Sequence, residues 1–220
     1  MRVYLAKNLR EANKNSAADN RRILDKHGAL MVNIMGAPGC GKTSLLEETL
    51  RRLSAKYRLA VIEGDLYTAE DAERLQPWTE EIVQINTEGG CHLEANLIGQ
   101  LLAGDSPALL QADILFIENI GNLVCPAEFD LGEDLRATLL SVTEGNDKPR
   151  KYPLAFKEAQ ATLITKTDLL EHVNFSLEQA LLDLKKLNAE AAIFPLSAKT
   201  GEGVENWCRW LEKKLAEKRR

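Results

Sequence analysis

The sequence has no long apolar run and no apolar leader. None of its hydrophobic stretches approaches the ~20 residues that a membrane-spanning helix needs. The first residues, Met1 to Lys7, lack the apolar core of a signal peptide. We therefore expect a cytoplasmic protein that does not associate with a membrane.

The sequence also has no excess of positive charge, and it contains few cysteines. The 28 Lys and Arg residues are outnumbered by 33 Asp and Glu residues, which gives a formal net charge of −5. Because nucleic-acid binding requires a basic surface that neutralises phosphates, we expect no nucleic-acid partner. The cysteines number four, and in a reducing compartment such thiols are buried, reactive or metal-binding rather than paired in disulfides.

The remaining pattern is typical of one α/β domain. With 220 residues, 45% of them hydrophobic, the chain is long enough to form a single core. Short apolar runs predict strands at residues 29–35, 59–63, 82–85, 114–118, 136–142, 161–165 and 192–195. Amphipathic stretches predict helices at residues 42–53, 69–75, 92–102, 177–187 and 203–218. This alternation predicts a mostly parallel sheet with helices on both faces.

Two further segments have a distinct character. Residues 8–27 are mostly polar with apolar positions at helical spacing, and Gly28 is a natural stop. We expect residues 1–28 to form a leading helix that packs on the main domain, residues 29–220, or on a partner chain. Residues 143–153 are polar and contain glycine and proline, which predicts a surface loop.

A phosphate-binding loop is the most specific short motif. The pattern G-x-x-x-x-G-K-[ST] is matched at every fixed position by Gly36, Ala37, Pro38, Gly39, Cys40, Gly41, Lys42 and Thr43, with Ser44 following. The motif follows a predicted strand and opens a predicted helix, which is the context of a P-loop NTPase fold. The glycines let backbone N–H groups surround a phosphate, and the helix N-terminus adds its positive dipole end. The Lys42 ammonium reaches the β- and γ-phosphates, and the Cys40 side chain is expected to point away from them.

Carboxylates at strand ends supply the expected acids of this site. Glu118 ends an apolar strand, like the second nucleotide-binding motif of P-loop proteins, and with the Thr43 hydroxyl it is predicted to hold Mg²⁺. Asp65 ends the preceding strand and is a candidate either for holding a magnesium-bound water or for orienting the attacking water. Asp71 is either a switch residue that helps to position water or an acid that complements a helix N-terminus. Lys42, Asp65 and Asp71 are the predicted catalytic residues.

Two later segments predict that the base is guanine. Thr165, Lys166 and Asp168 fit the Asn/Thr-Lys-x-Asp motif of GTPases, with threonine in place of the commoner asparagine. The Asp168 carboxylate can accept two hydrogen bonds from guanine, whereas adenine has no donors at those edges. The residues Ser197, Ala198 and Lys199 follow the next strand and are predicted to present a backbone amide to the guanine carbonyl.

Cys91, His92 and Cys125 form a candidate metal site. Thiolate and imidazole are ligands for Zn²⁺ and Ni²⁺. Cys91 and His92 follow two glycines at the predicted start of a helix, so both side chains could approach one ion. Three ligands are few for a closed site, and two chains could complete the coordination. The residues alone leave the alternative open that the cysteines are small buried hydrophobes and His92 an ordinary helix residue.

Residues 118–132, Glu-Asn-Ile-Gly-Asn-Leu-Val-Cys-Pro-Ala-Glu-Phe-Asp-Leu-Gly, closely resemble the long signature of the HypB family of SIMIBI-class GTPases. Residues 90–95 are similar to that family's second signature, and the likeness runs from about residue 10 to the C-terminus. The resemblance implies that Cys91, His92 and Cys125 hold metal at the interface of a nucleotide-promoted homodimer. It places Lys151 in a segment that reaches nucleotide across this dimer. Some members carry an extra cysteine motif at the N-terminus or a histidine-rich run, and this sequence has neither, so a separate tight metal site and nickel storage are not expected.

The resemblance implies a slow GTPase that delivers nickel to the precursor of [NiFe]-hydrogenase. Its partners would be a second copy, a nickel-handling accessory protein and the hydrogenase large-subunit precursor. No arginine finger is recognisable, which favours slow turnover. One alternative is a urease-accessory nickel GTPase, which is expected to carry Cys-Pro-His in place of Gly-Cys-His. The other is a small-molecule kinase, which would need an arginine-bearing lid.

Overall fold

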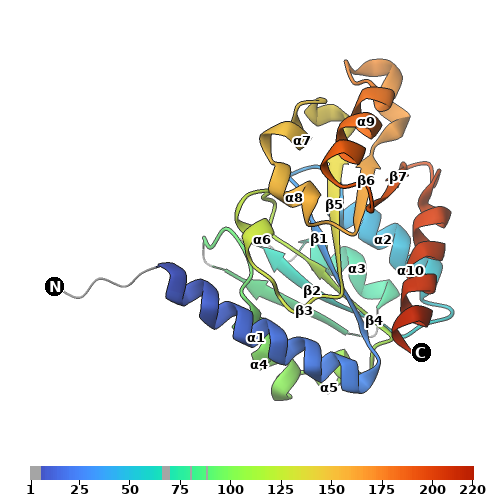
Figure 1. Cartoon of the computed structure of the whole chain (residues 1–220). Coiled ribbons are helices and arrows are strands. Elements are labelled where there is room, and N and C mark those ends of the chain that lie inside the picture. Colours follow the sequence, from blue (N-terminus) through green and yellow to red (C-terminus); the bar gives the residue numbers. More distant parts are fainter. Residues whose placement is uncertain (1–5, 66–69, 80, 88) are drawn as a thin grey trace.

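The computed structural model of the chain describes residues 6–65, 70–79, 81–87 and 89–220. One sheet runs through these residues in the order β3-β2-β4-β1-β5-β6-β7, and every neighbouring pair is parallel (Figure 1). Its strands are β1 (Leu30–Met35), β2 (Leu59–Asp65), β3 (Glu81–Asn86), β4 (Ile114–Glu118), β5 (Leu135–Ser141), β6 (Ala161–Thr165) and β7 (Ala192–Pro195). The predicted α/β P-loop fold with a mostly parallel sheet is confirmed.

Helices connect the strands. They are α1 (Ala6–His27), α2 (Lys42–Leu53), α3 (Glu70–Leu75), α4 (Ala95–Gln100), α5 (Pro107–Gln111), α6 (Cys125–Glu128), α7 (Lys148–Lys151), α8 (Pro153–Lys157), α9 (Leu177–Leu187) and α10 (Val204–Lys218). Shorter turns of 3-10 or π type lie at Gln76–Trp78, Leu101–Asp105, Val142–Glu144 and Thr167–His172. Within the described ranges no helix has the length and apolar character needed to cross a membrane.

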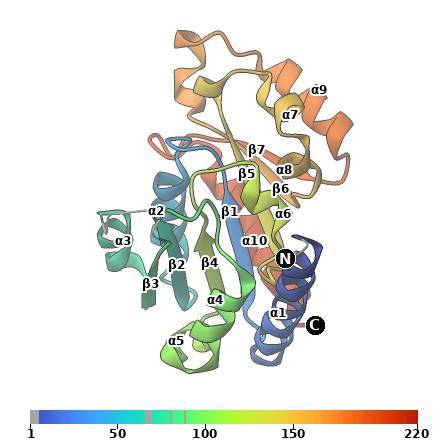
Figure 2. The same ribbon diagram turned by 90° about the vertical axis from the view of Figure 1, so that its left-hand side faces the viewer.

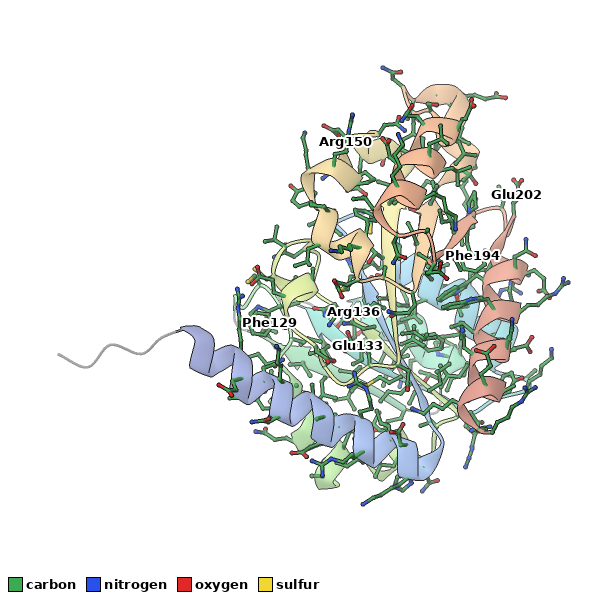
Figure 3. The ribbon with its side chains drawn as sticks, viewed as in Figure 1. Phe129, Glu133, Arg136, Arg150, Phe194 and Glu202 are labelled. Atoms are coloured by element: carbon green, nitrogen blue, oxygen red, sulfur yellow. The ribbon has the colours of Figure 1, made fainter. Side chains whose placement is uncertain are left out.

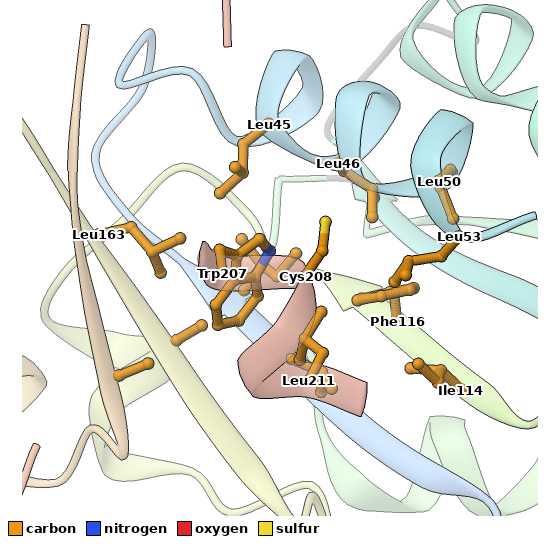
Figure 4. Close-up of a cluster of buried hydrophobic side chains, with 14 of the residues drawn as sticks. Leu45, Leu46, Leu50, Leu53, Ile114, Phe116, Leu163, Trp207, Cys208 and Leu211 are labelled. Carbon is orange, nitrogen blue, oxygen red and sulfur yellow. The ribbon is translucent and has the colours of Figure 1, made fainter. Parts of the chain in front are cut away.

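The helices bury both faces of the sheet. On one face α2 and α10 pack against alternate strand residues, so that Leu46 and Trp207 join Phe116 and Leu163 in one cluster (Figure 4). On the other face α1, α4 and α5 cover β1, β2 and β4, while α8 and α9 cover β5 and β6. In Figure 2, α1, α4 and α5 lie toward the lower end of the molecule and α9 lies toward the upper end. Burial on both faces explains why the strands are near-continuous apolar runs.

Two local predictions are wrong. The helix predicted from residue 92 begins at Ala95, because Glu94 is extended (φ −115°, ψ 148°). The Ala95 N–H donates instead to the side chain of Asn13 on α1, 82 positions away, and such a partner leaves no trace in the helical pattern. The predicted surface loop at residues 143–153 contains α7 and the start of α8. Pro149 of α7 is buried, so this part of the segment packs against the domain.

Candidate nucleotide and metal sites

The phosphate loop joins β1 to α2 at the carboxyl edge of the sheet. Gly39 (φ +70°) and Gly41 (φ +97°) adopt the left-handed conformation that glycine tolerates best. Gly41 is the N-cap of α2, whose first N–H groups have no acceptor within the helix. Cys40 lies between the glycines, but its thiol is buried in the core and burial raises its pKa to about 11. The loop therefore presents backbone amides, and the neutral thiol has a packing role.

A cavity of about 290 Å³ opens in front of this loop. Its lining consists of Gly39, Gly41, Lys42, Thr43, Ser44, Asp71, Arg74, Glu118 and Lys166. The Thr43 hydroxyl donates a 2.7 Å hydrogen bond to Oε1 of Glu118. The second carboxylate oxygen, Oε2, is buried and has no hydrogen-bond partner among the described residues. Oxygen donors beside a phosphate cavity suit Mg²⁺, so the residues fit this ion.

Burial controls the charge of Glu118. Desolvation raises the pKa of its carboxyl group to about 7, although the nearby Lys42 ammonium and the Thr43 hydrogen bond act in the opposite direction. Near neutral pH a cation beside the carboxylate would favour its charged form. The carboxyl group is thus poised to lose its proton when a metal ion arrives.

The raised pKa predicts a pH-dependent stability. Between pH 4.5 and about 7 the folded Glu118 stays protonated while the unfolded carboxyl ionises, so the folded state binds more protons and the free energy of unfolding falls as pH rises. In Glu118→Gln this contribution is absent. We expect the free energy of unfolding of the wild type minus that of the variant to fall by on the order of 3 kcal/mol across this pH window. Urea unfolding without nucleotide or Mg²⁺ measures both values. Parallel curves for the two proteins would contradict this expectation.

Asp71 and Arg74 of α3 lie at the same cavity. Nη1 of Arg74 is 3.4 Å from Oδ1 of Asp71, and Nη2 donates to Glu47 (2.6 Å) and Ser44 (3.4 Å). Arg74 is a site residue that the sequence reasoning missed. Its position three residues after Asp71, on one helix face, was the available signal. The predicted water-positioning role of Asp65, the last residue of β2, falls on a side chain outside the described residues.

A second cavity, of about 270 Å³, adjoins the first. It is lined by Gly41, Ser44, Thr165, Lys166, Asp168, Leu169, Ser197, Ala198 and Lys199. Gly41, Ser44 and Lys166 belong to both cavities. The structure therefore brings the predicted base-binding segments next to the phosphate loop, in the arrangement that one nucleotide requires.

Hydrogen bonds fix the base-binding segments. The Ser197 hydroxyl donates to Oδ1 of Asp168 at 2.6 Å, which joins the loops after β6 and β7. The Thr165 hydroxyl donates to the Cys40 carbonyl at 2.7 Å, and Nζ of Lys166 donates to the Gly39 carbonyl at 2.6 Å. Threonine thus ties the base motif to the phosphate loop.

The three candidate metal ligands lie together. The ligand atoms of Cys91, His92 and Cys125 are all within 4.8 Å of one another, and Cys91 Sγ is 3.4 Å from His92 Nδ1. Cys91 and His92 precede α4 in a non-helical segment, while Cys125 is the first residue of α6. The His92 ring packs on Phe129 with the ring centroids 3.9 Å apart, which fixes the orientation of the imidazole.

The ligand atoms of this cluster suit a borderline cation, and the imidazole is in the protonation state that a ligand needs. Burial lowers the pKa of His92, so its imidazole is neutral near pH 7, as a ligand must be. A hydrogen bond with the Cys125 thiol, followed by desolvation, raises the pKa of Cys91. Two sulfur atoms and one nitrogen suit Zn²⁺ or Ni²⁺ rather than Mg²⁺.

Asn122 joins the metal segments to the phosphate loop. Its backbone forms an antiparallel bridge with Gly36, and Gly121 next to it packs against Pro38, so close that an added Cβ would lie 3.0 Å from the proline. Its side chain donates to the Cys91 carbonyl (3.3 Å) and accepts from the Val124 N–H (2.8 Å). One residue therefore contacts both sites, a role that the sequence reasoning did not assign.

Comparison with known proteins shows the family of this chain. The family described as CobW/HypB/UreG, nucleotide-binding domain, matches residues 30–195. The chain is 41% identical over 213 residues to the probable hydrogenase maturation factor HypB of Methanocaldococcus jannaschii, covering 97% of this chain and 96% of that protein. The chain belongs to the HypB family. HypB from Azotobacter vinelandii is 45% identical over 201 residues, which are 91% of this chain but 66% of that longer protein.

A solved HypB structure has the same fold. HypB from Helicobacter pylori in complex with nickel superposes with a TM-score of 0.87 at 40% identity, covering 94% of this chain and 96% of that one. The predicted resemblance to HypB is thereby confirmed. Lys151, predicted to reach nucleotide across a HypB dimer, lines neither cavity; it is exposed on α7 and pairs with Asp147 (2.5 Å). Its role stays a prediction.

Proposed function

We propose that this chain is a slow GTPase that delivers nickel during maturation of [NiFe]-hydrogenase. GTP would occupy the two adjoining cavities, and Asp168 would select guanine. Lys42 would contact the β- and γ-phosphates, while Thr43 and Glu118 would hold Mg²⁺, which neutralises phosphate charge when bound. Asp65 or Asp71 would orient the attacking water. Zn²⁺ is an alternative occupant of the site that nickel would use.

Nickel is the cargo in this proposal, with Cys91, His92 and Cys125 as its ligands. The observation that carries the proposal is the path of residues 118–125, which begins at Glu118 beside the phosphate cavity and ends at Cys125. Asn122 and Gly121 contact the phosphate loop on the way. A change of nucleotide would therefore bias the position of the Cys125 thiol. A homodimer would supply the ligands that three side chains leave missing, and a hydrogenase precursor or accessory protein would exchange the metal.

A kinase remains a weaker alternative, because Asp168 and Ser197 form a base pocket suited to guanine donors. The urease-accessory alternative is not favoured by an observation on this chain. The Helicobacter pylori relative is a hydrogenase/urease maturation factor, so both processes are linked in that protein.

Light scattering tests the proposal. The molecular mass would be measured without nucleotide, with GDP and with a non-hydrolysable GTP analogue, each with and without Ni²⁺ or Zn²⁺. We expect the analogue to favour the dimer and the dimer to bind metal more tightly. If neither the molecular mass nor the metal affinity changes with nucleotide, nucleotide-coupled delivery is ruled out. GTP hydrolysis is then measured separately as phosphate release.

A further inference from the structure

Two asparagines of α1 lie on one face of that helix. Asn13 and Asn20 are seven residues apart, which is close to two helical turns. Asn20 is 1% exposed, and such a buried amide requires partners. We refer to Asn13 and Asn20 as the asparagine pair. Figure 1 shows α1 running beside α4.

The asparagine pair bonds both segments that carry the candidate metal ligands. Asn13 accepts from the Ala95 N–H (2.9 Å) and donates to the Asp130 carbonyl (2.7 Å). Asn20 donates to the Ala95 carbonyl (2.7 Å) and to the Leu131 carbonyl (2.9 Å). Both polar groups of the Ala95 backbone are therefore held by α1. Ala95 lies three residues after His92, and Asp130 lies five residues after Cys125.

Further contacts fit α1 to the same place. The Arg10 side chain pairs with Glu128, and Arg21 pairs with Asp130 at 3.2 Å. Gly132 (φ +92°) approaches α1 so closely that an added Cβ would lie 2.4 Å from the Ala17 carbonyl oxygen. Figure 3 shows Phe129, which packs on His92, and Glu133 beside α1. The helix α1 thus lies along residues 128–133, which begin three positions after Cys125.

We propose that the asparagine pair positions the nickel ligands, with α1 setting the spacing between the segment of Cys91 and His92 and the segment of Cys125. This inference rests on the proposed nickel site. A metal site binds tightly only when its ligands are held close to the required geometry. The Asn13 bond also satisfies the first N–H of α4, which otherwise lacks an acceptor. Without it, α4 loses its defined start and the preceding His92 loses its fixed position.

The test compares Asn13→Ala with Asn15→Ala. Asn15 is exposed on the same helix, so its substitution is the matched control. Loss of groups that orient metal ligands weakens metal affinity by about 10–100-fold, and for Asn13→Ala we expect about tenfold weaker Ni²⁺ binding by competition with a chelating dye. The thiolate-to-nickel absorption band is expected to shift as well. GDP affinity and the thermal midpoint are expected to stay near the Asn15→Ala values.

Each other outcome has a definite meaning. Equal Ni²⁺ affinity in Asn13→Ala and Asn15→Ala would overturn the positioning role while leaving the nickel site intact. Parallel losses of Ni²⁺ affinity, GDP affinity and thermal midpoint would also overturn it, because general destabilisation would then explain the result. Asn20→Ala, measured in the same way, repeats the test from the second asparagine. If Cys125→Ala binds Ni²⁺ as tightly as the wild type, the nickel site itself is wrong and both proposals fail.

Discussion

Replacing Asp168 with asparagine is expected to weaken GTP binding by roughly two to three orders of magnitude. The Asp168 carboxylate can accept hydrogen bonds from the N1–H and the amino group of guanine, and a hydrogen bond to a charged group is worth about 1.5–3 kcal/mol. Loss of about 3–4 kcal/mol corresponds to this change in affinity. Asparagine also turns an N–H group toward the guanine donors, which adds repulsion.

The fold is expected to survive this substitution. The introduced amide oxygen would still accept the Ser197 hydroxyl, so the loops after β6 and β7 stay joined. Xanthine has a carbonyl where guanine has an amino group, and the new amide can donate to it. We therefore expect Asp168→Asn to gain affinity for xanthosine triphosphate, measured by isothermal titration. Asp19→Asn, which alters an exposed carboxylate on α1, is the control. Unchanged GTP affinity in Asp168→Asn would refute the guanine pocket.

Replacing Cys125 with alanine is expected to reduce Ni²⁺ affinity by more than ~100-fold. Loss of a hydrogen-bond partner of a metal ligand lowers affinity by about 10–100-fold, and this substitution removes a ligand atom itself. Cys91 and His92 remain, but two side chains hold a divalent ion weakly. GDP affinity without metal is expected to stay unchanged, since Cys125 lines neither nucleotide cavity. Competition with a chelating dye measures the first quantity, and fluorescent GDP measures the second.

Cys208→Ala is the matched control for this experiment. Cys208 lies on α10 and is buried in the core against α2, away from the metal-site cluster. Burial raises the pKa of its thiol to about 12, so the thiol is neutral. The same substitution there removes one thiol without touching the candidate site. If Cys125→Ala and Cys208→Ala bind Ni²⁺ equally well, the cluster of Cys91, His92 and Cys125 is not the nickel site.

Only a short length of chain, residues 118–125, separates the phosphate cavity from the candidate metal site. Gly121 and Asn122 lie against the phosphate loop, and Val124 beside Cys125 is 52% exposed. Cys125 therefore belongs to a short segment that contacts the phosphate loop and that also carries an exposed apolar residue. Nucleotide, dimerisation and metal would act on the same few residues in the proposed mechanism.

Short-range patterns determined much of this protein. The P-loop between residues 36 and 43, the strands and the long helices α2 and α9 follow from spacing and hydrophobic period, because these depend on neighbouring residues. Asp168 and Ser197 were identified in the same way, and the structure brings them into contact. Cys91, His92 and Cys125 were grouped as candidate ligands by their chemistry, and the resemblance of their segments to HypB is what favoured a metal site. Residues alone left their role open.

Only the tertiary structure decided the contacts between distant segments. The start of α4 at Ala95 depends on Asn13, and the Thr165 hydroxyl finds the Cys40 carbonyl 125 positions away. Arg74 reaches the phosphate cavity through the placement of α3, and Asn122 reaches Cys91 across 31 positions. Such partners follow no period along the chain, because the sheet order sets which loops meet. The chemistry could therefore be read from the sequence, whereas the groups that hold it in place required the fold.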